Sequence, residues 1–195
     1  LIGIIDTGCP FMHPRLMRPK APGGKPATRV RALWDQEREP ELTVGDMTRT
    51  PYGVEVPRGL LDAAIAAAHG DDRRCYASIG YDALRRTGSH GSHSLGMLTG
   101  YWDRHSDWGS DPPDIAFVQL ARNLTFAPSR GALSAAILDG LMWLLAQRRP
   151  GELLIVSIGH GSPMGPHDGS TIFEQAVDRL LASLGPSVVR LHVPA

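Results

Sequence analysis

Asp6 is the first residue of the chain that could do chemistry. It follows a short apolar run, Leu1-Ile-Gly-Ile-Ile5, and is followed by Thr7-Gly8, where a glycine permits a sharp turn. A carboxylate in this position can serve a catalytic site, but it can equally cap or stabilise a turn. The tripeptide Asp-Thr-Gly also occurs in aspartic peptidases. Those proteins are all-β, and this chain has at least three strong helical patterns, so that interpretation is set aside.

Two histidines lie close together in the segment Ser89-His-Gly-Ser-His-Ser-Leu-Gly96, at the start of a predicted helix. His90 and His93 could be surface residues of a helix start. They could also form a metal-binding pair, since they are three residues apart. Zinc-binding helices more often space the two histidines four apart, and no third ligand is obvious. A metal-dependent hydrolase using His90, His93 and Asp6 is therefore kept as an alternative.

Taken together, these two stretches resemble the catalytic motifs of the subtilisin-like serine peptidases, the subtilases. The family's Asp motif, apolar-apolar-Asp-Thr-Gly followed by His-Pro, matches Ile4–Gly8 and His13-Pro14. The family's His motif, His-Gly-Thr-His-x-x-Gly, matches residues 90–96, with Ser92 in place of Thr. The motifs also come in the expected order, each on the expected element. The resemblance implies that Asp6 and His90 are catalytic.

A third segment, Val156-Ser-Ile-Gly159, is similar to the family strand that ends in Ser-apolar-Gly. The resemblance implies that Ser157, Ile158 and Gly159 bind the main chain of a polypeptide substrate, which would lie alongside as an added strand. The alternative is an ordinary strand end with a glycine turn. The family's next strand runs into Ala-Gly-Asn, whose Asn is an oxyanion donor. Val193-Pro-Ala195 stops where Gly-Asn would follow.

The nucleophile of the family is missing from these 195 residues. No Gly-Thr-Ser motif occurs, and serines such as Ser92 and Ser162 lack a Gly-x-Ser-x-Gly frame. The resemblance therefore implies a serine endopeptidase whose Ser lies beyond residue 195, and a segment that is inactive alone. Cys9, near Asp6, is interpreted as a small buried thiol. A non-catalytic binding or scaffold module is the other alternative, although a scaffold has no chemical need for both Asp6 and His90.

Cofactors and partners are weakly indicated. Many subtilases bind calcium, but no acidic cluster here has a calcium-loop spacing, so no cofactor site is predicted. The resemblance alone favours a secreted or periplasmic protein. Lys plus Arg and Asp plus Glu each total 20, so no net charge attracts nucleic acid or an anionic membrane. The sequence contains no run of 18 apolar residues of the kind that could span a bilayer. Cys9 and Cys75 could form one disulfide but do not define the compartment.

Apolar strands alternate with helices along the chain. These elements must position the candidate site residues, such as Asp6 and His90. Strands are expected at 1–5, 114–120, 153–158 and 187–193, and helices at 59–68, 90–101, 133–147 and 171–184. The helix at 133–147 is expected to be amphipathic, with an apolar stripe of Leu133, Ile137, Leu141, Leu144 and Leu145. Thr171 with Glu174 predicts a capping box. This order predicts an α/β, three-layer, doubly wound and mostly parallel sheet. Ligands of such sheets bind beyond the carboxyl ends of the strands, where Asp6, Gly159 and Ala195 fall.

The organisation predicted is one partial catalytic domain over residues 1–195, incomplete at its C-terminal side. Both ends of the sequence fall inside apolar core elements, so we expect a piece of a longer protein. Asp6 and His90 are 84 positions apart (90 minus 6), which is farther than in the smallest subtilases. An insertion is therefore predicted at about 19–86. Its segments Leu33–Gln36 and Tyr52-Gly53 resemble one seen in some bacterial subtilases. Residues 10–57 are expected to be loops with short pieces of structure, and the insertion a surface excursion.

Overall fold

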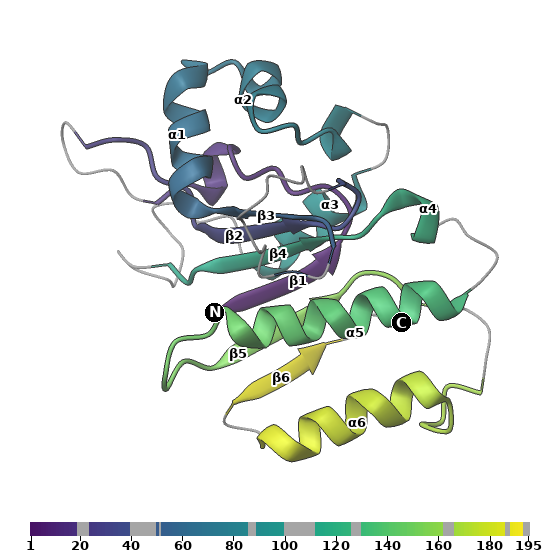
Figure 1. Cartoon of the computed structure of the whole chain (residues 1–195). Coiled ribbons are helices and arrows are strands. Elements are labelled where there is room, and N and C mark those ends of the chain that lie inside the picture. Colours follow the sequence, from purple (N-terminus) through teal and green to yellow (C-terminus); the bar gives the residue numbers. More distant parts are fainter. Residues whose placement is uncertain are drawn as a thin grey trace.

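The computed structural model describes residues 1–18, 24–39, 50, 52–85, 89–99, 112–125, 130–161, 166–185 and 188–192. Within these ranges a six-stranded sheet has the order β3-β2-β4-β1-β5-β6 (Figure 1). The strands are β1 (Ile2–Asp6), β2 (Val30–Asp35), β3 (Val54–Pro57), β4 (Ile115–Gln119), β5 (Leu154–Ile158) and β6 (Val189–His192). The helices are α1 (Arg58–Ala68), α2 (Asp72–Ser78), α3 (His90–Leu98), α4 (Arg122–Thr125), α5 (Arg130–Ala146) and α6 (Ile172–Leu184), with 3-10 turns at Pro14–Leu16 and Ala83–Arg85.

The sheet is parallel except for its edge strand β3, which runs antiparallel to β2. Helices α1, α2 and α3 cover one face, and α5 and α6 cover the other (Figure 1). All five residues of β1 and of β4 are buried, as expected for strands that are covered on both faces. The predicted three-layer α/β fold is confirmed. No helix among the described residues is long and apolar enough to span a membrane.

Two apolar clusters, one on each face of the sheet, form the core. On the α5 face, the predicted residues Leu133, Ile137, Leu141 and Leu144 are buried. Trp143 is buried as well, which widens the apolar surface of α5 beyond the predicted stripe. The reason is that Trp143 packs against Trp34 of β2, with ring centroids 5.9 Å apart, and its Nε1–H donates to Glu55 of β3 at 2.9 Å. Helix α6 begins with the predicted capping box between Thr171 and Glu174.

The short pieces of structure expected within residues 10–57 include the two strands β2 and β3. Strand β2 lies inside the sheet between β3 and β4, and Leu33 and Trp34 in it are buried. Its charged residue, Arg31, obscures the apolar pattern, yet in the structure this side chain is fully paired at the sheet end. The surface excursion expected for the insertion is wrong for β2 and for α1, whose Leu61 and Ile65 are buried. The insertion itself stays a prediction.

The ends of two predicted elements fall outside the described residues. The helix expected at 90–101 ends at Leu98 with Thr99 as its cap, and residues 100 and 101 are not among those described. The final strand covers 189–192, and residues 193–195 are likewise outside. The predicted position of Ala195 at a strand end therefore has no structural counterpart here.

A network of hydrogen-bonded ion pairs between arginines and carboxylates links the amino ends of the strands. Asp114, just before β4, accepts hydrogen bonds from Arg18, Arg31 and Arg58. Arg31 also donates to both carboxylate oxygens of Glu152, at 2.8 and 2.7 Å. Burial opposes ionisation of Asp114, but the hydrogen bond from Arg18 and the charge of Arg58 outweigh it and hold the pKa of Asp114 below its ordinary value. The network joins β2, β4 and α1 at the amino ends of the strands, which is the end of the sheet opposite to Asp6.

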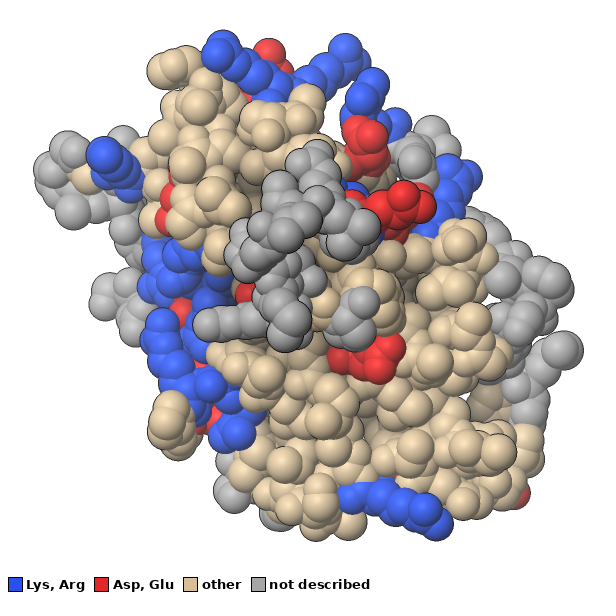
Figure 2. Space-filling model, viewed as in Figure 1, with Lys and Arg blue, Asp and Glu red and all other residues tan. Residues whose placement is uncertain are grey.

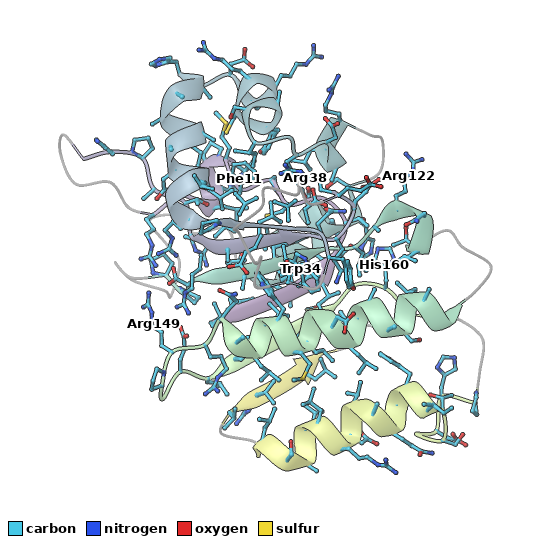
Figure 3. All side chains as sticks on the ribbon, in the orientation of Figure 1. Phe11, Trp34, Arg38, Arg122, Arg149 and His160 are labelled. Atoms are coloured by element: carbon cyan, nitrogen blue, oxygen red, sulfur yellow. The ribbon has the colours of Figure 1, made fainter. Side chains whose placement is uncertain are left out.

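Positive charge is in excess at this end of the sheet. Figure 2 shows a blue patch at the left of the molecule, at the end of the sheet where Figure 3 labels Arg149. Arg29 is fully buried beside the network, and its Nη1 and Nη2 atoms have no hydrogen-bond partner among the described residues. Burial and the nearby charge of Arg18 lower the pKa of Arg29 to about 10.

Candidate active site

Asp6 is the last residue of β1, and its side chain is fully buried. The backbone N–H of Thr7 donates to Asp6 Oδ1 at 2.7 Å, which fixes one carboxylate oxygen. Gly159, at the end of the neighbouring strand β5, lies directly against the carboxylate. A Cβ atom at position 159 would be 1.9 Å from Asp6 Oδ2. Any larger residue at 159 would therefore displace the carboxylate.

His90 is the first residue of α3, and its side chain is 52% exposed. Its Nδ1 atom lies 2.9 Å from each of the two carboxylate oxygens of Asp6. The start of α3 is held against the turn after β1, since the N–H of Gly91 donates to the carbonyl of Thr7 at 2.6 Å. A Cβ at position 91 would lie 2.6 Å from that same carbonyl oxygen. The glycine thus permits the close approach that brings His90 to Asp6.

Two side chains that the sequence analysis missed hold the turn after Asp6. Gln119 pairs with Asp6 in the β1–β4 register, and its Oε1 accepts from the N–H of Gly8 at 2.7 Å. The hydroxyl of Tyr81 donates to the same oxygen and accepts from the N–H of Cys9, both at 2.7 Å. Gly8 itself has φ of +87°, which a residue with a side chain rarely adopts. A polar residue ending an otherwise apolar strand was the available signal for Gln119.

His160 is the third ionisable residue at this position, and the sequence analysis missed it too. Its Nε2 atom lies 3.3 Å from Asp6 Oδ1, and its ring centroid lies 5.5 Å from that of His90. The approach to Asp6 is poorly aligned, so this buried nitrogen makes no hydrogen bond to any described residue. Figure 3 shows His160 at the carboxyl ends of the strands, opposite to Arg149. Its place just after Gly159 was the signal in the sequence.

The electrostatics favour an ionised Asp6. Burial opposes ionisation, but contacts from His160 and His90 and the hydrogen bond from Thr7 outweigh it, so the pKa of Asp6 is lowered. An ionised carboxylate can only accept hydrogen bonds, so Nδ1 of His90 must be the donor. In a neutral imidazole the other nitrogen, Nε2, then carries the free lone pair. His90 is thereby prepared to accept a proton on its Nε2 atom.

The other predicted site residues are placed as follows. Ser157 is buried and pairs with Ile4 of β1 and with His192 of β6, which is the last β5–β6 pair within the described part of the chain. Ile158 and Gly159 continue beyond that pairing. His93 is exposed and does not join the cluster of Asp6, His90 and His160. The pairing of His90 with His93 that the metal alternative required is therefore not found.

The structure also bears on the possible nucleophiles. Cys9 and Cys75 are both free and buried, so they do not form the possible disulfide. Burial raises the pKa of the Cys9 thiol and raises the pKa of Cys75 to about 11, so neither is an activated thiolate. Among the described residues, Ser94 is the serine that contacts the His90 ring, and it does so at Nδ1, 3.4 Å away. No described serine is bonded to Nε2.

Comparison with known proteins supports the fold. No family model and no curated protein matches the chain. Among solved structures, the chain is similar to the CspB protease of Clostridium perfringens, with a TM-score of 0.65 and 19% sequence identity. The match covers 98% of this chain and 34% of that protein, so the chain spans about a third of its length. At this identity the likeness shows a shared fold.

Proposed function

We propose that this chain supplies the Asp–His half of the active site of a subtilisin-like serine endopeptidase. The observation that supports it best is the 2.9 Å contact between Nδ1 of His90 and the buried carboxylate of Asp6. The similarity to a protein that is itself a protease agrees with this proposal. The motif resemblance around Asp6 and His90 agrees with it independently.

In the proposed mechanism, His90 Nε2 accepts the proton of a serine hydroxyl and later returns it to the leaving amine. Asp6 holds the imidazole in the tautomer that exposes Nε2 and stabilises the imidazolium that forms. This help has a local reason, because His90 begins α3. The positive end of a helix dipole disfavours a cation by about 0.3–1 kcal/mol. The ionised Asp6 offsets that field.

The substrate is proposed to be a polypeptide bound in extended form beside Ile158 and Gly159. The proposed contact is made by the backbone of Ile158 and Gly159, which follows the described β5–β6 pairs and would hydrogen-bond to the main chain of the substrate. This position lies next to Asp6, because Gly159 contacts its carboxylate. Bound there, a scissile carbonyl would lie near His90.

The serine nucleophile and the oxyanion donors are proposed to come from parts of the protein outside these 195 residues. The chain spans about a third of the similar protease, which leaves ample length for them. The 195-residue segment alone is therefore expected to be inactive. The same reasoning makes the full-length protein the right material for every functional test.

Labelling of the full-length protein with a fluorophosphonate probe, followed by peptide mapping, tests this function. We expect one labelled serine beyond residue 195, and loss of the label in His90→Ala. Folding of the variant is checked by circular dichroism. A folded protein in which no serine is labelled would overturn the proposal in favour of a non-catalytic binding module.

A further inference from the structure

Three potential metal ligands converge at the candidate active site. They come from Asp6, His90 and His160, each of which offers one ligand atom within 4.8 Å of the other two, and the nitrogens that approach Asp6 are Nδ1 of His90 and Nε2 of His160. Two contacts are shorter, 2.9 Å between His90 and Asp6 and 3.3 Å between His160 and Asp6. Ligand atoms around a tetrahedral zinc ion stand about 3.3–3.5 Å apart, given bonds of about 2.0–2.2 Å.

His160 is the residue that points to a ligand. A proton relay through Asp6 and His90 does not need it, yet its Nε2 is buried against Asp6 without forming a hydrogen bond. A buried polar atom without a partner is costly, and a cation between His160 and Asp6 would satisfy it. Two imidazole nitrogens and one carboxylate oxygen form a donor set that suits Zn²⁺ and its neighbours rather than Ca²⁺ or Mg²⁺.

The surroundings leave room for the ion to enter. The His90 side chain is 52% exposed and that of His160 is 24% exposed, so the cluster opens toward solvent on the histidine side. Water could therefore complete the coordination as a fourth ligand.

We propose that Asp6, His90 and His160 form a site for a divalent transition metal, with Zn²⁺ the expected ion, that reversibly switches off the Asp6–His90 pair. The binding half of this inference stands on the ligand geometry alone. The regulatory half rests on the proposed peptidase function.

The switch follows from the chemistry of the imidazole. In the proposed catalytic state, Nδ1 of His90 donates its proton to Asp6, and Nε2 is free to accept a proton from serine. A metal on Nδ1 takes the position of that proton. The neutral ring then carries its single proton on Nε2, which can no longer act as a base. The ion also occupies the carboxylate of Asp6, so both members of the pair are withdrawn from catalysis.

Metal binding is tested by titrating the chelator-treated, full-length protein with Zn²⁺ by calorimetry and with Co²⁺ by visible absorption. We expect one ion per chain in a tetrahedral environment. Losing even an outer-sphere partner of a metal ligand costs about 10–100-fold in affinity, so His160→Gln should lose at least about tenfold. His93→Gln is the matched control, because His93 is an exposed histidine on α3 outside the cluster. It should keep the wild-type affinity.

A measurement on the unaltered protein covers the case in which His160→Gln fails to fold. On addition of Zn²⁺, the imidazole ¹⁵N resonances of His90 and His160 should shift together, while those of His93 should not. Zinc affinity that His160→Gln leaves unchanged, or resonances of His160 that do not respond, would overturn the proposed site.

Fluorophosphonate labelling with and without Zn²⁺ separates this inference from the proposed function. We expect Zn²⁺ to block labelling of the wild type, a chelator to restore it, and His160→Gln to label equally well with and without Zn²⁺. Stoichiometric metal binding without any labelled serine would sustain the site but defeat the peptidase and its regulation. Labelling that is indifferent to Zn²⁺ would defeat the switch alone. Activity that requires zinc would also contradict an inhibitory site.

Discussion

The carboxylate of Asp6 and Nδ1 of His90 lie 2.9 Å apart although the residues are separated by 84 positions in the chain. Two close backbone approaches produce this contact. The N–H of Gly91 bonds to the carbonyl of Thr7, and Gly159 leaves space for the carboxylate. The candidate site therefore depends on glycines that take no part in the proposed chemistry.

Gly159→Ala should damage the site more than the fold. The added Cβ would lie 1.9 Å from Asp6 Oδ2, so the carboxylate must move away from His90. A displacement of about 1 Å in an active site can cost about 100-fold in rate, and we expect a loss in kcat/KM of that order. Peptidase kinetics of the full-length variant measure it.

Gly161→Ala is the control for that substitution. It adds the same methyl group two residues away, where nothing lies within 4 Å. Its kcat/KM should stay within a few-fold of wild type. Equal losses in both variants would show that the loop tolerates no side chain at all, which contradicts a specific role for the Gly159–Asp6 contact.

The Asp114 network should make stability depend on acid pH. The pKa of Asp114 is lowered in the folded state, so its stabilising contribution is complete above the unfolded value of about 3.9 and is lost as the pH falls through the folded pKa. Removing one partner of a buried ion pair costs about 3–5 kcal/mol. Asp114→Asn should lower the unfolding free energy by about that amount at pH 7, as measured by denaturant titration.

The difference between Asp114→Asn and wild type should shrink as the pH falls below about 4, because wild-type Asp114 then becomes protonated as well. A difference that is the same at pH 7 and at acid pH would mean that the charge of Asp114 does not stabilise the fold.

Arg29→Met should stabilise the protein. Arg29 is fully buried, two of its nitrogens are unpaired among the described residues, and the charge of Arg18 opposes its own. Replacing even a buried ion pair by apolar side chains of similar volume is often neutral or stabilising by about 1–4 kcal/mol. One kcal/mol corresponds to about 2–4 °C in Tm for a domain of this size. We therefore expect a Tm a few degrees above wild type.

Arg31→Met is the matched control for Arg29→Met. Arg31 donates to both Asp114 and Glu152, so the substitution removes a shared cation from two carboxylates, although Arg18 and Arg58 still contact Asp114. It should lower the Tm. The expectation for Arg29 would be contradicted if both variants were destabilised to the same extent.

The sequence predicts much of the sheet because continuous apolar runs, such as those of β1, β4 and β5, are typical of buried parallel strands. It predicts β2 poorly, because Arg31 interrupts the run and is tolerated only through Asp114 and Glu152, which come from distant segments. Local patterns cannot anticipate such pairing. The edge strand β3 is short and largely half-buried, so its pattern is equally weak.

The candidate site likewise has residues that the sequence predicts and residues that it does not. Asp6 and His90 are carried by local motifs, so the sequence is sufficient to propose them. His160 and Gln119 reach the site only because β4 and β5 are the two neighbours of β1, an order that the sequence does not specify. Asp6 pairs with Gln119 across one interface and contacts His160 beyond the other.

Peptidase activity of the full-length His90→Ala protein tests the central claim most directly, with His93→Ala as the matched histidine on the same helix. If Asp6 and His90 form the proton relay, His90→Ala should lower kcat/KM by about 10⁴-fold or more, and His93→Ala should stay within a few-fold of wild type. A folded His90→Ala protein that cleaves peptides at the wild-type rate would contradict the account.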